Sequence, residues 1–387
     1  MAPLTSIRTS DNKIEIVNQL VLPHTVEWLV IDTIEQAHAA IKTMQIRGAP
    51  AIASLAALTF AQNLERSLAS DSAPDFLSSP DALRAHVEPQ LAYLYTARPT
   101  AVNLGEATRR VTRVLNAEIE AGKDARAVAE ELVKTGKLVA DEDVGRCREM
   151  SRLGAEWLQK ETKTRGTSQS GSELNVMTVC NTGSLATAGY GTALGLITHL
   201  FETGKLNRAY YTQSAPYHQG SRLTAFELKS LGIPSTMIVD TMVGSLFQHY
   251  PIHGIAVGAD RIAANGDTAN KIGTYNAAVL AARHNIPFIV VAPVTTVDLS
   301  ISSGADIPIE QRPPVEACVV RGALFPLEEG RPQARVLLTP EGVAESEGGV
   351  YNPSFDVTPA ELISAIVTEK GVAVRKADGT FDLSSVV

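Results

Sequence analysis

The chain has 387 residues, 44% of them hydrophobic and 20% charged, which is the composition of a globular protein and a length that favours two domains. Its formal net charge of −8 argues against a nucleic-acid surface or a basic membrane patch. No apolar run reaches transmembrane length and the N-terminus lacks the apolar core of a signal peptide, which predicts an intracellular protein.

The first segments in chain order predict a small sheet and a helix. Apolar residues recur over 14–17, 20–23 and 28–31 between turn residues, a pattern typical of short antiparallel strands. A helix is expected to begin near Thr33, because Thr33 and Gln36 have the spacing of a capping box.

Two arginines stand at predicted helix starts. Arg47, Gly48 and Ala49 precede Pro50 and a helix expected over 51–68, and Pro50 suits the first helical position. An arginine beside unpaired helix-start amides can bind a phosphate group. Arg98 repeats this arrangement before the next helix, although either site alone is more often surface structure.

Helical patterns then lead to the predicted domain boundary. Helices are expected over 101–121, 125–138 and 143–160, and two polar stretches, 67–81 and 162–173, are typical of surface insertions. We therefore predict an N-terminal sheet-plus-helical domain at 1–160, a linker or insertion at 161–174 and a second domain at 175–387.

The second domain has the pattern of a Rossmann-like α/β fold with a parallel sheet. Short apolar runs alternate with helical segments from residue 175 onward. Strands are expected over 175–180, 208–212, 235–240, 254–257 and 288–292, with helices over 185–201, 221–231 and 270–284. Ligands in such folds bind beyond the carboxyl ends of the strands.

Cys180 ends the first of these strands and precedes Asn181-Thr-Gly-Ser184 at an expected helix start. The helix dipole and unpaired N–H groups there would lower the pKa of the thiol, which could then act as an acid, a base or a nucleophile. The alternative is a small apolar residue that fills the core. The two other cysteines, Cys147 and Cys318, are widely spaced, so we expect reduced thiols.

Asp260 follows the strand at 254–257, where a general base belongs in this architecture. Alternatively it caps the next segment or pairs with Arg261. Asn270 and Lys271 are expected at a helix start, where they could hold a phosphate or a sugar hydroxyl or simply be solvated. Gln219 could bind a hydroxyl group.

The glycines at 189, 191 and 195 have the wrong spacing for a dinucleotide site and fall inside the helix expected at 185–201. His249 and His253 are separated by Pro251, and the chain has no Cys-x-x-Cys or His-Glu-x-x-His pattern. We therefore predict neither a metal nor a nucleotide cofactor.

Seven segments together resemble the methylthioribose-1-phosphate isomerase family, which is related to the regulatory subunits of translation initiation factor 2B. They run in the family's order over nearly the whole chain: Ile46-Arg-Gly-Ala-Pro-Ala-Ile52, Ala97-Arg-Pro-Thr-Ala-Val-Asn-Leu104, Cys180-Asn-Thr-Gly-Ser184, Gln219-Gly-Ser-Arg-Leu-Thr-Ala225, Val257-Gly-Ala-Asp-Arg-Ile262, Asn265-Gly-Asp-Thr-Ala-Asn-Lys-Ile-Gly273 and Asn352-Pro-Ser-Phe-Asp-Val-Thr-Pro359.

The resemblance implies conversion of cyclic 5-methylthioribose 1-phosphate to 5-methylthioribulose 1-phosphate in methionine salvage. It makes Cys180 and Asp260 the catalytic pair. It also implies a homodimer in the cytoplasm, and in fungi and animals in the nucleus as well. The implied substrate contacts are Arg47, Gly48, Ala49, Arg98, Gln219, Asn270 and Lys271.

Two alternatives share this fold. One is ribose-1,5-bisphosphate isomerase, which keeps the catalytic pair, and the other is a non-enzymatic initiation factor 2B-like subunit, which is not expected to keep all the charged site residues. The sequence also departs from the family pattern. Gln213 and Ala215 stand where many relatives have glutamate and arginine, and Gly105 stands where tryptophan is common.

Overall fold

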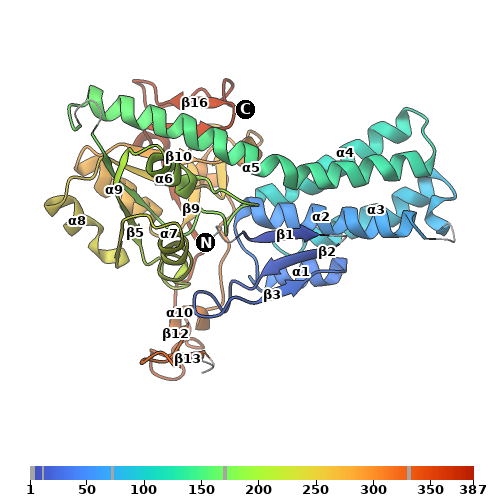
Figure 1. Ribbon diagram of the computed structural model, residues 1–387, viewed down its shortest axis with the longest axis horizontal. Helices are drawn as coiled ribbons and strands as arrows, with labels where there is room; N and C mark the ends of the chain where they lie inside the picture. Colours follow the sequence, from blue (N-terminus) through green and yellow to red (C-terminus); the bar gives the residue numbers. More distant parts are fainter. Residues whose placement is uncertain (1–4, 11–12, 71–73, 169–171, 329–332) are drawn as a thin grey trace.

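The computed structural model describes residues 5–10, 13–70, 74–168, 172–328 and 333–387. It confirms the predicted α/β class, with a small antiparallel sheet and helices at one end and a larger, mostly parallel sheet at the other (Figure 1). Within these described ranges, no helix combines the length and apolar character needed to cross a membrane.

The N-terminal sheet is antiparallel, as expected, but its strands differ from the predicted set. Its order is β1 (Ile7–Ser10), β2 (Lys13–Val17) and β3 (Trp28–Val30). The apolar run at 20–23 forms a turn instead of a strand. Helix α1 (Ile34–Lys42) begins as predicted, because the Thr33 hydroxyl accepts the Gln36 N–H and the Gln36 side chain accepts the Thr33 N–H.

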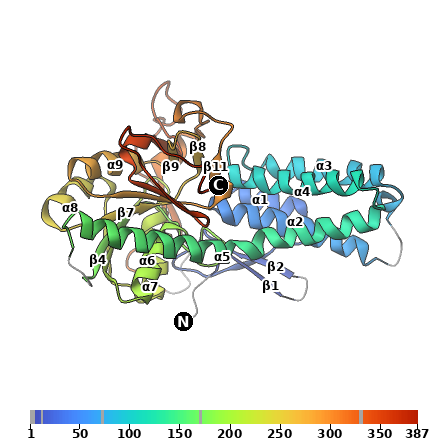
Figure 2. The ribbon, with the colours of Figure 1, turned by 90° about the horizontal axis from the view of Figure 1, so that it is seen from above.

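Four longer helices pack behind this sheet (Figure 2). They are α2 (Ala49–Leu68), α3 (Pro80–Tyr95), α4 (Val102–Glu120) and α5 (Ala125–Thr164), with the short 3₁₀ helix η1 (Asp75–Leu77) before α3. Sequence analysis did not identify α3. Its N-cap is Ser79, whose hydroxyl accepts the Ala82 N–H, and Pro80 occupies its first turn.

Helix α5 is one continuous helix of 40 residues, so the break predicted between 138 and 143 is wrong. The polar residues there fit the helix because Glu142 pairs with Arg110 of α4 at 2.8 Å and with Arg146 one turn on at 2.5 Å. The first part of α5 packs in the N-terminal core through Val128 and Leu132, and its last part packs against the large sheet (Figure 2). Where the domains divide therefore stays a prediction.

The large sheet has seven strands in the order β16-β15-β10-β7-β4-β5-β6. Neighbours from β10 to β6 are parallel, as are β10 and β15, and only β16 runs antiparallel. The strands are β4 (Leu174–Thr178), β5 (Leu206–Thr212), β6 (Ser235–Ile238), β7 (Gly254–Val257), β10 (Phe288–Val291), β15 (Ala365–Thr368) and β16 (Gly371–Val374).

Apolar side chains cover both faces of this sheet, as expected for a doubly wound fold. One face packs on α5 and α6 (Ala193–Glu202), and the other packs on α8 (Val243–His249) and α9 (Thr274–Arg283). Three short helical segments connect β5, β6 and α8: the π-helical η2 (Gly220–Thr224), the α-helix α7 (Ala225–Ser230) and the 3₁₀ helix η3 (Asp240–Met242).

A second sheet of four strands, absent from the sequence prediction, borders the large one. Its order is β11 (Val297–Asp298), β8 (Arg261–Ala263), β9 (Thr268–Lys271) and β14 (Phe355–Thr358). Near it lie η4 (Val294–Thr296), η5 (Gly304–Asp306), α10 (Val315–Cys318) and η6 (Ala360–Leu362), and the hairpin of β12 (Val319–Gly322) and β13 (Ala334–Leu337) projects from the body (Figure 1).

The strand order places a topological switch point between β4 and β7. From β4 the chain continues outward through β5 and β6, and it then returns to β7 on the other side of β4. Cys180 follows the carboxyl end of β4 and Asp260 follows that of β7. Ligands of open α/β sheets bind at such a point.

Candidate active site

One cavity at this switch point is lined by all nine residues singled out from the sequence. Counted out to its open mouth, with the solvent there included, it encloses about 910 Å³. The nine are Arg47, Gly48, Ala49, Arg98, Cys180, Gln219, Asp260, Asn270 and Lys271. Met44, Tyr217, Ser354 and Phe355, which were not predicted, line it as well.

Cys180 lies beside Gln219 on the floor of the cavity and is 4% exposed. Its thiol donates to the Gln219 Oε1 atom at 3.1 Å. Its φ of +67° is uncommon for a residue other than glycine. Two side chains hold this backbone, because the Cys180 N–H donates to Ser214 Oγ at 2.8 Å and Thr224 Oγ1 donates to the Cys180 carbonyl at 2.6 Å.

The helix expected directly after Cys180 does not form there, so this prediction is wrong. Helix α6 begins at Ala193, and the intervening loop is closed by a bridge between Gly183 and Gly191. A Cβ on Gly191 would lie 2.6 Å from the Gly183 Cα, so the two backbones meet too closely for larger residues. The glycines at 189 and 191 therefore lie before the helix, and Gly195 lies in its first turn.

Glu227 of α7 replaces that helix as the support of the loop, and sequence analysis missed it. Its carboxylate accepts the Ser184 N–H and the Ser184 hydroxyl, both at 2.7 Å. Burial raises the pKa of Glu227, while these hydrogen bonds and the one from Asn181 lower it in part. The acidic residue in Phe226-Glu-Leu228 is 43 positions from Ser184, so no local pattern connects them.

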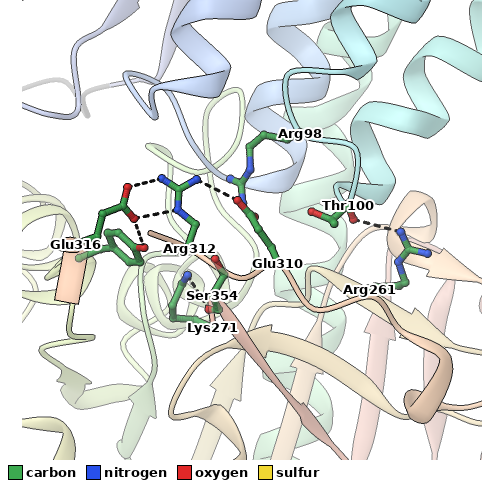
Figure 3. Close-up of polar contacts among 9 residues, drawn as sticks. Arg98, Thr100, Arg261, Lys271, Glu310, Arg312, Glu316 and Ser354 are labelled. Carbon is green, nitrogen blue, oxygen red and sulfur yellow. Dashed lines mark hydrogen bonds and ion pairs between the residues drawn. The ribbon is translucent and has the colours of Figure 1, made fainter. Parts of the chain in front are cut away.

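Asp260 lines the cavity, with its N–H bonded to the Ala269 carbonyl at 2.8 Å. Burial raises the pKa of its carboxyl, and the charges of Lys271, Arg98 and Arg47 lower it only in part. Arg261 does not pair with Asp260. It pairs instead with Asp298 at 2.9 Å and donates to the Thr100 carbonyl at 3.2 Å (Figure 3).

Asn270 and Lys271 reach the cavity from strand β9 and not from a helix start, so that prediction is wrong. β9 pairs antiparallel with β14, and helix α9 begins only at Thr274. The Lys271 ammonium donates to the Ser354 carbonyl at 2.9 Å (Figure 3) and lies 4.8 Å from the centre of the Phe355 ring. Burial lowers the pKa of Lys271, and the nearby Cys180 and Asp260 raise it in part.

The N-terminus of α2 points its backbone at the same cavity. Gly48 has a φ of +99° and sits against Ala186, whose carbonyl accepts the Ala51 N–H at 3.2 Å. Among the described residues, the N–H groups of Gly48 and Ala49 have no hydrogen-bond partner. Unpaired amides at a helix N-terminus favour an anion.

Arg98 enters from the loop between α3 and α4 and is the first member of an ion-pair chain (Figure 3). It pairs with Glu310 at 2.5 Å, Glu310 pairs with Arg312 at 3.1 Å, and Arg312 pairs with Glu316 at 2.6 Å. The Tyr217 hydroxyl donates to Glu316. The Nε atom of Arg98 is buried and has no partner within the described part of the chain, so it can still donate to a ligand.

Arg222 donates to the carbonyls of Gln19, Leu22 and Tyr217, and among the described residues it forms no ion pair. In the segment that departs from the family pattern, Gln213 contacts His218 at 3.0 Å, and Ser214 is the residue that holds the Cys180 backbone. In the described ranges no group of three or more His, Cys, Asp or Glu side chains could hold a metal ion.

Known proteins resemble this chain over nearly its whole length. The Initiation factor 2 subunit family matches residues 45–374. A Postia placenta protein named methylthioribose-1-phosphate isomerase is 68% identical over 392 aligned positions, which cover 100% of both chains.

Two solved structures extend the comparison. The 5-methylthioribose 1-phosphate isomerase of Pyrococcus horikoshii OT3 is 33% identical with a TM-score of 0.76, covering 96% of this chain and 92% of that one. A structure titled translation initiation factor eIF-2B, subunit delta, from A. fulgidus is 34% identical with a TM-score of 0.72, covering 97% and 98%. The chain therefore belongs to the initiation factor 2 subunit family and, within it, to the methylthioribose-1-phosphate isomerases.

Proposed function

We propose that this chain converts 5-methylthioribose 1-phosphate to 5-methylthioribulose 1-phosphate, with Cys180 and Asp260 as its acid–base pair. One observation carries the assignment of roles: a thiol and a carboxyl from the ends of adjacent strands line the same cavity as two arginines and a helix N-terminus. This combination suits a sugar that carries a phosphate group.

The reaction needs one proton delivered and one removed. The C1–O4 ring bond breaks and O4 takes up a proton, the hydrogen on C2 moves to C1, and the C2 hydroxyl loses its proton as the C2 ketone forms. The phosphate on C1 prevents the spontaneous ring opening of a free sugar, so the protein must supply the acid that protonates O4.

Asp260 suits the acid role. Burial raises the pKa of its carboxyl, which favours the protonated form that can donate to O4. Cys180, as the thiolate, then suits the base that receives the C2 hydroxyl proton and becomes the thiol, which can donate to Gln219. Lys271, whose pKa is lowered by burial, stands near both groups and can stabilise charge that develops during the transfer.

We assign the phosphate group to the part of the cavity lined by Arg47, Gly48, Ala49 and Arg98, which we call the phosphate wall. The donors available there are the unpaired N–H groups of Gly48 and Ala49, the guanidinium of Arg47 and the unpartnered Nε of Arg98. Gln219 and Asn270, both buried, are left for the sugar hydroxyls.

The direct test is turnover of 5-methylthioribose 1-phosphate by the wild type, Cys180→Ser and Asp260→Asn. Each variant is expected to lose about 10²–10⁴-fold in kcat, the usual contribution of a general acid or base. Cys318→Ser is the matched control, because Cys318 is also buried but lies in α10 outside the cavity. Near-wild-type turnover by either site variant would remove that residue from the chemistry.

Labelled substrate separates the two routes for the C2 hydrogen. Retention of deuterium from C2 at C1 of the product indicates a direct hydride shift. Loss of the label to water excludes the hydride shift and indicates proton transfer through an enediolate.

Substrate competition tests the alternatives. Faster turnover of ribose 1,5-bisphosphate than of the methylthio sugar would reassign the substrate. A stoichiometric complex with initiation factors, together with no isomerase activity, would reassign the chain to a regulatory role.

We also propose that the protein is a homodimer of the cytoplasm and nucleus, with domains 1–160 and 175–387 as divided above. Light scattering should then give twice the 41.2 kDa mass of one chain. Exclusion of the tagged full-length protein from nuclei would limit the location to the cytoplasm.

A further inference from the structure

Asn181 connects the phosphate wall of the cavity to a buried carboxylate. Arg47 donates through Nη1 to the Asn181 side-chain oxygen at 2.7 Å and through Nη2 to the Asn181 carbonyl at 2.5 Å. On its other side the Asn181 amide nitrogen donates to Glu227 Oε1 at 2.7 Å. Arg47, Asn181 and Glu227 are all at most 8% exposed.

The orientation of this amide decides whether Arg47 is held. A side-chain amide has one accepting end and one donating end, and Arg47 can only donate. Asn181 therefore serves Arg47 only when its oxygen faces the guanidinium, with its nitrogen turned away. An amide flipped end for end would place N–H groups against N–H groups.

Glu227 fixes that orientation. Among the described residues, the hydrogen-bond partners of its carboxylate are all donors: Asn181 Nδ2, Ser184 N and Ser184 Oγ at 2.7 Å, and Leu185 N at 3.4 Å. The carboxylate lies close against Gly183, because a Cβ on that residue would be 2.3 Å from Glu227 Oε2.

We propose that Glu227 is a positioning residue that acts through Asn181 to aim the Arg47 guanidinium at the phosphate group of the substrate. The inference rests on the proposed function, in which Arg47 contacts that phosphate. Glu227 itself is outside the residues that line the cavity and does not touch the substrate.

Glu227→Gln tests the proposal with little change in volume. The new amide nitrogen is expected to face Asn181, because the two short bonds from Ser184 need an oxygen. Asn181 then flips and presents its NH₂ group to Arg47. Loss of one charge-assisted hydrogen bond predicts a roughly tenfold or larger rise in the Kd for inorganic phosphate and in KM, with a smaller change in kcat.

A second substitution should reverse the effect. In the double variant Glu227→Gln with Asn181→Asp, the carboxylate at 181 accepts from both the new amide and Arg47, so phosphate affinity should recover toward the wild-type value. In an Arg47→Ala background, Glu227→Gln should cost no further phosphate affinity, because the residue through which it acts is absent.

Asp143→Asn is the matched control. Asp143 of α5 is another buried carboxylate that holds the same loop, because it accepts the Ala188 N–H at 2.6 Å, but among the described residues it makes no hydrogen bond with Asn181. We expect unchanged phosphate affinity in this variant. Equal weakening by Asp143→Asn and Glu227→Gln, or further weakening by Glu227→Gln in the Arg47→Ala background, would overturn the proposal in favour of a general role in loop folding.

Calorimetric titration with inorganic phosphate keeps this test separate from that of the enzyme activity. Phosphate binding that depends on Glu227 in a protein without isomerase activity would support the positioning role and refute the proposed function. An active enzyme whose Glu227→Gln variant keeps the wild-type phosphate affinity would support the proposed function and refute the positioning role. If that variant does not fold, the double variant decides: a folded protein that binds phosphate supports the proposal, and any other result overturns it.

Discussion

Gly48 at the start of α2 offers a quantitative test of how the phosphate wall is built. Its φ is +99°, and a Cβ at this position would lie 2.3 Å from the Ala186 carbonyl oxygen, where ordinary contacts are 3.4–4 Å. Gly48→Ala must therefore push the start of α2 and the Ala186 loop apart by about 1 Å, since both are backbone.

The substitution should destabilise the protein through two effects. The unfavourable backbone conformation costs about 1–2 kcal/mol for a residue with a Cβ, and relieving the overlap costs about 1–3 kcal/mol more. We expect the free energy of unfolding to fall by about 2–5 kcal/mol in total. A displacement of about 1 Å at a substrate-positioning element also predicts a loss of roughly 10²-fold in kcat/KM.

Urea unfolding and steady-state kinetics measure both losses, and Gly122→Ala provides the control. Gly122 has a φ of +75° but no atom within 4 Å of the added Cβ, and it lies in the turn between α4 and α5. In Gly122→Ala the free energy of unfolding should fall only by the cost of the backbone conformation, about 1–2 kcal/mol, and the activity should be unchanged. The reasoning fails if Gly48→Ala is as stable and as active as Gly122→Ala.

Two more measurements test the charges and thiols of the site. Burial raises the pKa of Asp143 from 3.8 to about 6, so its contribution to stability is present below pH 4 and is lost as the pH rises through 6. Asp143→Asn should remove this loss. The urea midpoint of the variant, minus that of the wild type, should therefore increase from pH 4 to pH 7 and stay constant above pH 7. N-ethylmaleimide should modify Cys180 before Cys147, because Cys147 is fully buried and burial raises the pKa of its thiol. Inorganic phosphate should slow that reaction, and peptide mass spectrometry that finds Cys147 modified first would contradict the assignment.

Features that depend on neighbouring residues were predictable from the sequence. The capping box of Thr33 and Gln36 is formed as expected, and strand β7 has the predicted bounds. The carboxyl ends of β4 and β7 were located closely enough to bring Cys180 and Asp260 to one cavity. These predictions succeeded because a cap or a buried strand is specified within a few residues.

Features that depend on distant residues were not predictable. The residues after Cys180 have a helical pattern, but the helix begins only at Ala193. The loop before it is held by Glu227, which lies 43 positions from its partner Ser184. Asn270 and Lys271 are drawn into a strand by β14, whose Asp356 pairs with Asn270. The chain from Arg98 through Glu310 to Arg312 likewise joins segments more than 200 residues apart, as the separation of 212 between its first two members shows. A single sequence contains no local signal for such contacts.

The continuous helix α5 also limits how this protein can evolve. At about 1.5 Å per residue, its 40 residues form a rod of roughly 60 Å, and opposite ends of that rod complete two different cores. We call the part of the molecule around each core a lobe. If recombination replaced one lobe with that of a relative, the side chains of α5 would still have to pack against the replaced lobe. We therefore expect the two lobes to have been inherited together and their substitutions along α5 to be correlated.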